Sequence, residues 1–180
     1  DKRVIREENI VKVQAMQGNL DSIDKNEIHK ILCICNPNQI LEIEQKVQSH
    51  PWTENQFRQS VDSYSSTVIE HQGDVVGFCI LQPVVDEANL LLMAVDPSMQ
   101  GKGLGYQLLE QSLQLLKNDP VQIFLEVRES NVAAIALYQK SGFHQIDVRK
   151  NYYPKAGGGK EHAVIMVKMC SDNFADLFKM

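Results

Sequence analysis

The architecture of this chain follows from one glycine-rich stretch, Val95-Asp-Pro-Ser-Met-Gln-Gly-Lys-Gly-Leu-Gly-Tyr-Gln-Leu-Leu109. The apolar run Leu90–Val95 before the glycines predicts a strand, and the leucine spacing over Leu108–Leu116 predicts a helix after them. Three glycines in five positions leave backbone N–H groups uncovered where this helix starts. Because such groups and the positive end of a helix dipole attract anions, the stretch predicts a phosphate or pyrophosphate site, to which Lys102 adds a charge.

The composition is that of an ordinary globular domain. The chain has 180 residues, 43% of them hydrophobic and 23% charged, which suffices for one domain with a sizeable core. The net charge of −5 argues against coating nucleic acid or a membrane surface and favours a basic partner. No apolar run approaches the roughly 20 residues that a membrane-spanning helix needs. We therefore expect no direct nucleic-acid binding and no membrane association.

The four cysteines predict neither a disulfide framework nor a metal site. Cys79 lies in an apolar strand pattern and is expected in the core. Cys33 and Cys35 lie near His29, but no second ligand pair accompanies them, so we expect no metal. Thiols without a framework and a highly charged first segment, unlike a signal peptide, predict a cytoplasmic location.

The first 36 residues are predicted to form an appended helical segment. Ile5, Ile10, Val13 and Met16 are spaced loosely like one face of a helix, and Asp21–Cys35 repeats the pattern. This segment could pack on the main domain, or it could be an arm that binds a partner. The chain is therefore expected to divide into an N-terminal extension over 1–36, a main domain over 37–170 and a tail over 171–180.

Two helices are predicted before the sheet. Gln39–Val47 is amphipathic, and a capping box, Thr53-x-x-Gln56, opens the second helix. Trp52, just before the cap, is expected to pack on Phe57 as a hydrophobic staple. The side chains expected on the inner faces are Ile40, Ile43, Val47, Phe57 and Val61.

From Ser66 the sequence period changes to that of strands, with a turn at Gly73 and a loop expected over Asn151–Lys160. The run Asn89–Val95 is almost continuously apolar, which predicts burial on both of its faces. The pattern predicts an α/β (α+β) fold in one domain, with a mixed, mostly antiparallel sheet flanked by helices. The expected strands are Thr67–Glu70, Val75–Leu81, Asn89–Val95, Val121–Val127, Phe143–Val148 and Ala163–Met169.

Two motifs together carry a family resemblance. Gln100-x-x-Gly103-x-Gly105 follows a strand, and Asn131-x-Ala-Ala-x-Ala-Leu-Tyr138-x-x-x-Gly142-Phe143 lies downstream. The first is similar to the acyl-CoA pyrophosphate signature of the GNAT acetyltransferase superfamily, and the second resembles that superfamily's other signature. The resemblance implies a GNAT-like domain that uses acetyl-CoA as co-substrate and needs no metal.

Four shorter segments resemble the bacterial ribosomal-protein alanine N-acetyltransferases, over about Ile40–Met169. This resemblance implies acetylation of the N-terminal alanine of the eighteenth small-subunit ribosomal protein, presented as a basic peptide. Relatives usually read Glu-Asp-Ala before the last strand, whereas this chain reads Glu161-His162-Ala163 after a longer glycine run, which bears on peptide selectivity. The segments are Pro51-Trp-Thr-Glu-x-x-Phe57, Asp86-Glu-Ala88 with Ala94-Val-Asp-Pro97, Leu125-Glu-Val-Arg-x-Ser-Asn131 and Asn151-Tyr-Tyr-Pro154.

The resemblance implies a role for each matched residue. Glu126 would be the general base that takes a proton from the acceptor amine, and Tyr138 the general acid that protonates the leaving thiolate. Backbone groups at the end of the third strand would face the pantetheine and the acetyl group. The implied cofactor-binding residues are Met93, Ala94, Val95, Gln100, Gly101, Lys102, Gly103, Leu104, Gly105, Tyr106 and Asn131.

The residues themselves leave alternatives open at these positions. Glu126 is out of place in the apolar strand Ile123–Val127 unless it faces a cleft, but it could instead pair with Arg128. Asn131 and Tyr138 lie about two helical turns apart and can share a face, but could equally be a capping residue and a buried aromatic. No cysteine lies in the matched motifs, so we expect direct transfer in a ternary complex rather than an acyl-enzyme.

Other functions share the same cofactor motif. An acetyltransferase for protein lysine or for a small-molecule amine would keep the core and change the acceptor pocket. A non-catalytic acyl-CoA sensor would not need Glu126 and Tyr138. Asp86 and Glu87 could receive a basic peptide or simply form a solvated turn. Gly157-Gly-Gly-Lys160 is not a P-loop, because its spacing fails and a glutamate follows the lysine.

Overall fold

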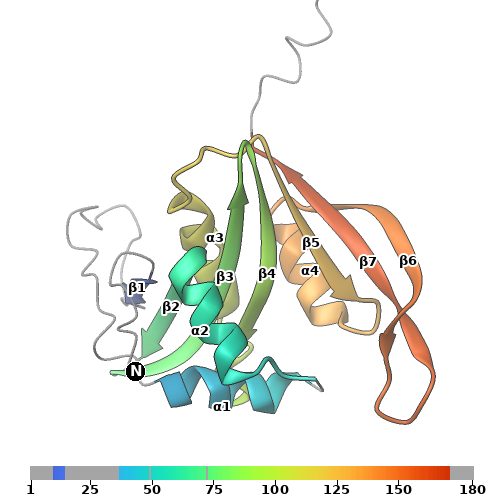
Figure 1. Cartoon of the computed structure of the whole chain (residues 1–180), viewed down its shortest axis with the longest axis horizontal. Coiled ribbons are helices and arrows are strands. Elements are labelled where there is room, and N and C mark those ends of the chain that lie inside the picture. Colours follow the sequence, from blue (N-terminus) through green and yellow to red (C-terminus); the bar gives the residue numbers. More distant parts are fainter. Residues whose placement is uncertain (1–9, 15–36, 49, 72, 171–180) are drawn as a thin grey trace, which may run out of the picture. The chain divides into compact units, whose positions relative to one another are not determined.

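A computed structural model describes residues 10–14, 37–48, 50–71 and 73–170 (Figure 1). The described residues fall into two units. The first contains those up to Leu81 together with Leu92–Leu115, and the second contains Gln82–Leu91 and those from Leu116 onward. No helix among the described residues is long and apolar enough to cross a bilayer.

The strand order of the first unit is β1-β2-β3-β4. β1 (Ile10–Gln14) runs parallel to β2 (Ser65–His71), which forms the predicted antiparallel hairpin with β3 (Asp74–Val84). The hairpin turn places Gly73 at a φ of +92°, a conformation that favours glycine. β4 (Glu87–Val95) contributes its second half to this unit. The fully buried side chains of this sheet include Val68, Ile69, Phe78, Cys79 and Leu81.

Three α-helices among the described residues belong to the first unit, and the predicted local signals start one of them, α2. In the capping box, Thr53 Oγ1 accepts a bond from the Gln56 N–H at 3.3 Å, and Gln56 Oε1 accepts one from the Thr53 N–H at 2.8 Å. The Trp52 and Phe57 rings lie 5.5 Å apart, which confirms the staple. In Figure 1, α2 lies in front of β2 and β3 and α3 lies behind them. The helices are α1 (Pro37–Val47), α2 (Glu54–Ser63) and α3 (Leu104–Gln114).

Most of the predicted inner faces of these helices are buried. Ile40, Ile43 and Phe57 are buried, whereas Val47 is 36% exposed. Val47 is the last residue of α1, so its side chain lies on the turn that ends the helix. The side chain of Val61 lies outside the described part of the structure.

The strand order of the second unit is β4-β5-β7-β6, with β7 antiparallel to both of its neighbours. Glu87–Leu90 of β4 pairs in parallel with Gln122–Leu125 of β5. The predicted mixed sheet flanked by helices is therefore confirmed. β6 and β7 form a long, twisted hairpin in Figure 1. The elements are β5 (Gln122–Arg128), α4 (Val132–Lys140), β6 (His144–Pro154) and β7 (Lys160–Met169).

The prediction of a helix through Ile10 and Val13 is wrong, because residues 10–14 form a strand. Three of these five residues are isoleucine or valine, whose branched side chains favour strands, and pairing with β2 satisfies their backbone. The rest of the predicted N-terminal segment, with Cys33 and Cys35, lies outside the described residues, as does the tail after 170.

Two further expectations about the strands need correction. Asn151–Pro154, predicted to begin a loop, belongs to β6, and β7 begins at Lys160 rather than Ala163, because Tyr153 and Pro154 pair with the start of β7. β4 is not equally buried on both faces. Its residues alternate between buried and half-buried, as in a strand with one face turned to the core.

Candidate functional site

The glycine-rich loop adopts backbone conformations that favour glycine. Gly101 and Gly103 have φ values of +75° and +80°, and Gly103 is the N-cap of α3. A Cβ on either residue would meet no atom within 4 Å, so the backbone angle rather than crowding requires glycine in the free protein. Gly105 lies in the first turn of α3, where φ is negative. Gly103 offers no side-chain cap, so the start of α3 presents N–H groups suited to an anion.

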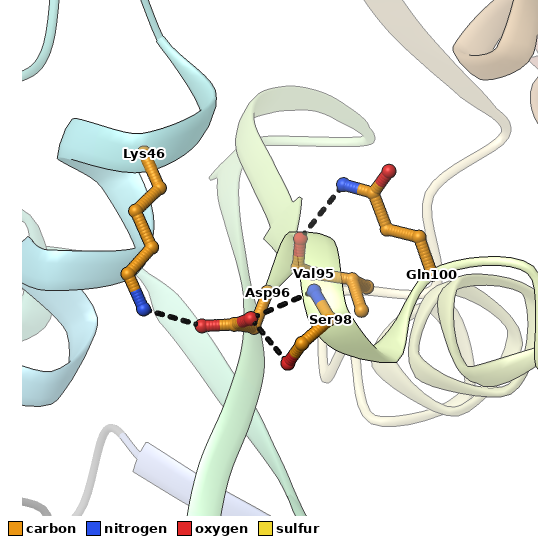
Figure 2. Close-up of polar contacts among 5 residues, drawn as sticks. All are labelled: Lys46, Val95, Asp96, Ser98 and Gln100. Carbon is orange, nitrogen blue, oxygen red and sulfur yellow. Dashed lines mark hydrogen bonds and ion pairs between the residues drawn. The ribbon is translucent and has the colours of Figure 1, made fainter.

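A polar cluster precedes this loop at the end of β4 (Figure 2). Asp96 Oδ1 accepts hydrogen bonds from the Ser98 N–H at 2.9 Å and the Ser98 hydroxyl at 2.7 Å, which caps the short 3-10 helix η2 (Pro97–Met99). Lys46 Nζ of α1 lies 2.9 Å from Asp96 Oδ2. Lys46 and then Ser98 lower the pKa of Asp96 to about 2. The cluster therefore ties α1 to the turn that leads into the glycine loop.

The end of β4, where the sequence places Met93, Ala94 and Val95, is held from two sides. Gln100 Nε2 donates to the Val95 carbonyl at 3.0 Å, so this predicted cofactor residue also fixes the loop onto the strand (Figure 2). On β3, a Cβ at Gly77 would lie 2.9 Å from the Ala94 carbonyl oxygen. Glycine at this position therefore allows the two strands to approach closely.

Asn131 and Tyr138 lie on α4 in the second unit. Asn131 is the N-cap of the helix, and its Oδ1 accepts a bond from the Ala134 N–H at 3.2 Å, as predicted. Tyr138 is buried and packs edge-on against Phe143, with the ring centroids 5.9 Å apart. The capping and packing roles that the sequence left open are both present, and the cofactor roles of these residues stay a prediction.

Glu126 lies on the half-buried face of β5 and forms an ion pair with Arg149 of β6. The distance between Glu126 Oε1 and Arg149 Nη1 is 2.9 Å. Arg128, the partner for Glu126 that the sequence left open, forms an ion pair with Glu161 of β7, at 2.7 Å. The Ser130 side chain and Arg128 lower the pKa of Glu161.

Two tyrosines of β6 lie against the two arginines. The Arg128 guanidinium lies 4.5 Å from the centre of the Tyr153 ring, and that of Arg149 lies 5.4 Å from the Tyr152 ring. Burial and then the charge of Glu126 raise the pKa of Tyr153. Each arginine on this face therefore contacts both a carboxylate and an aromatic ring.

β6 bulges opposite His162 of β7. Residues 150–152 lie opposite His162 alone, because the register shifts between Arg149 and Tyr153. His162 Nδ1 accepts a hydrogen bond from the Asn151 N–H at 3.0 Å, and Asn151 has a φ of +52°. The histidine therefore supports the bulge that follows Arg149.

One of the two acidic residues between β3 and β4 forms a hydrogen bond within the protein. Asp86 is exposed, whereas the Glu87 carboxylate accepts a hydrogen bond from the Gln122 side chain. Of the residues described above, sequence reasoning missed Arg149 and Lys46. Each forms an ion pair with a residue far away in the sequence, and no local pattern marks such a contact.

Comparison with known proteins identifies the family of this chain. The model of the Acetyltransferase (GNAT) family matches residues 26–143. The [ribosomal protein bS18]-alanine N-acetyltransferase of Haemophilus influenzae is 42% identical over 134 residues, which are 73% of this chain and 91% of the relative. The protein of the same name from Escherichia coli K12 is 43% identical over 126 residues, 69% of this chain and 84% of the relative.

A solved structure agrees with the sequence relatives. The crystal structure of the ribosomal-protein-S18-alanine N-acetyltransferase from Escherichia coli superposes with a TM-score of 0.70 at 40% identity, covering 75% of this chain and 88% of that one. The family match includes residues of both units, so the two units are parts of one family domain. On these grounds the chain belongs to the GNAT acetyltransferase family.

Proposed function

We propose that this chain transfers the acetyl group of acetyl-CoA to the N-terminal alanine of ribosomal protein bS18. The observation that carries the proposal is the 42–43% identity to enzymes named for this reaction, over 84–91% of their own lengths. The acceptor is then a protein rather than a nucleic acid, and the reaction takes place in the cytoplasm. The net charge of −5 supports a basic acceptor peptide.

The first unit supplies the groups for the acyl donor. The loop from Gln100 to Tyr106 would bind the pyrophosphate through backbone N–H groups, because positive φ at Gly103 leads directly into the start of α3. Lys102 is exposed, so its attraction is screened and adds little. Backbone groups of Met93, Ala94 and Val95 would bind the pantetheine and polarise the thioester carbonyl.

The second unit supplies the groups that move protons. An α-amino group has a pKa near 8, so it must lose a proton before its nitrogen can attack the thioester carbon. The Glu126 carboxylate would take this proton, directly or through water. When the carbon–sulfur bond breaks, the Tyr138 hydroxyl would protonate the thiolate of coenzyme A, and Asn131 would hydrogen-bond the cofactor.

An acetylation assay on a peptide panel tests the acceptor. The peptides start with Ala, Ser, Gly or Met and share one downstream sequence, with an N-terminally blocked peptide containing an internal lysine as the control. We expect transfer to the α-amine of the Ala peptide, located by mass spectrometry. Activity on lysine alone would overturn the Nα assignment. Cofactor binding without turnover on any acceptor would instead identify a sensor.

A further inference from the structure

One face of the second unit carries two arginines in register. Arg128 of β5 and Arg149 of β6 both pair with Ala163 of β7, which lies between them. Paired residues of neighbouring strands place their side chains on the same face of a sheet. The side chain of Ala163 is small and buried, and each arginine forms an ion pair with a carboxylate of another strand.

The two ion pairs of this face differ in their environment. In the first pair, the side chains of Arg128 and Glu161 are only 20% and 6% exposed, and Arg128 also donates to the Pro154 carbonyl at 3.0 Å. In the second pair, the side chains of Arg149 and Glu126 are 51% and 30% exposed. The first pair fastens the strands together, whereas the second leaves a carboxylate that solvent, and therefore a substrate, can reach.

The half-open pair joins residues that are not neighbours in the sheet. Glu126 lies on β5 and Arg149 on β6, with β7 between them. The Tyr152 ring lies under the Arg149 guanidinium, and the bulge at residues 150–152 carries this ring. An exposed ion pair contributes little to stability, so its geometry matters mainly for what it does to Glu126.

We propose that Arg149 is a positioning residue for Glu126, whose carboxylate it holds in one orientation. This inference rests on the proposed role of Glu126 as the base. The guanidinium, 2.9 Å from Glu126 Oε1, restricts the torsion angles of the glutamate side chain, so the accepting carboxylate does not have to be oriented during the reaction.

The test uses Arg149→Met, which removes the charge and keeps much of the side-chain length, and Arg149→Lys, which keeps the charge. Lys150→Met is the matched control, because Lys150 is the adjacent exposed residue of β6 and its change removes the same charge. We expect Arg149→Met to lower kcat for the Ala peptide by about tenfold or more, within the range that a general base contributes. Arg149→Lys should recover part of the loss, the KM for acetyl-CoA should not change, and Lys150→Met should resemble the wild type.

A double-mutant cycle separates positioning from a general loss of structure. If Arg149 acts through Glu126, then Arg149→Met should cause no further loss of kcat in the Glu126→Gln background. Losses that multiply in the double variant would overturn the proposal, as would an unchanged kcat in Arg149→Met. Thermal unfolding of all variants checks that they are folded.

A measurement that needs no substrate keeps this test independent of the proposed function. Crystal structures of the wild type, Arg149→Met and Lys150→Met compare the orientation of the Glu126 carboxylate. We expect the same single orientation in the wild type and in Lys150→Met, and a different orientation or several orientations in Arg149→Met. The wild-type orientation retained in Arg149→Met contradicts the inference. A wild-type protein inactive on every Ala peptide contradicts the proposed function and leaves this measurement valid.

Discussion

At the residue scale, the first unit contains a buried carboxylate, Glu44, for which the described residues provide no ion-pair partner. Glu44 of α1 is fully buried, its Oε1 accepts a bond from the Trp52 N–H at 3.3 Å, and its Oε2 has no hydrogen-bond partner among the described residues. Burial raises its pKa from 4.5 to about 7, although the Trp52 hydrogen bond opposes the rise. Glu44 therefore gains or loses its charge near neutral pH.

This shift predicts a stability that falls as the pH rises. The folded state holds the Glu44 proton more tightly than the unfolded state. The stabilisation that this proton provides is therefore complete below pH 4.5, and it is lost as the pH rises from 4.5 through about 7. The loss corresponds to roughly 3 kcal/mol at full ionisation. Urea unfolding between pH 5 and pH 8.5 should show this slope in the wild type and a much flatter one in Glu44→Gln.

Glu42→Gln is the control for this measurement, because Glu42 lies on the same helix and is exposed. It should keep the wild-type slope. Equal slopes in all three proteins would mean that folding does not raise the pKa of Glu44.

At the scale of elements, the turn into α3 combines a conformational requirement with the proposed pyrophosphate contact. Gly103→Ala should cost about 1–2 kcal/mol of stability, since alanine is strained at a positive φ. Gly73→Ala should cost a similar amount, because Gly73 also has a positive φ and a Cβ there would likewise meet no atom within 4 Å. Only Gly103→Ala should weaken acetyl-CoA binding, by about tenfold or more in calorimetry. Equal affinities of the two variants for acetyl-CoA would contradict the proposal that this loop binds the pyrophosphate.

Elements whose signals are local could be predicted from the sequence. The capping box at Thr53, the hairpin at Gly73 and the cap of α4 at Asn131 each depend on a few consecutive residues, and all three are confirmed. β1 and the second half of β6 could not be predicted, because each exists through pairing with a distant strand. The Glu126–Arg149 pair was missed for the same reason: its two strands are neighbours of β7, and only the register of the sheet brings the charges together.

At the scale of the whole molecule, the proposed reaction divides its tasks between the two units. The first contains the glycine-rich loop and the end of β4, which are proposed to hold the acyl donor. The second contains Glu126, Asn131 and Tyr138, which are proposed to act on the acceptor and the leaving group. The chain's net charge acts on both substrates, and it acts in opposite directions on a basic peptide and on the anionic cofactor.

The net charge of −5 therefore predicts a salt effect that depends on the acceptor. Long-range attraction speeds the approach of a basic peptide, and salt shortens its range from about 10 Å at 0.1 M to about 3 Å at 1 M. At saturating acetyl-CoA, kcat/KM for a lysine- and arginine-rich Ala peptide should fall several-fold as salt rises across this range. A peptide with the same first residues and serines in place of the basic ones should change little. If kcat/KM falls equally for both peptides, the salt acts on cofactor binding or on the fold, which contradicts the prediction. If kcat/KM falls only for the basic peptide, the effect is due to attraction of the acceptor by the acidic protein.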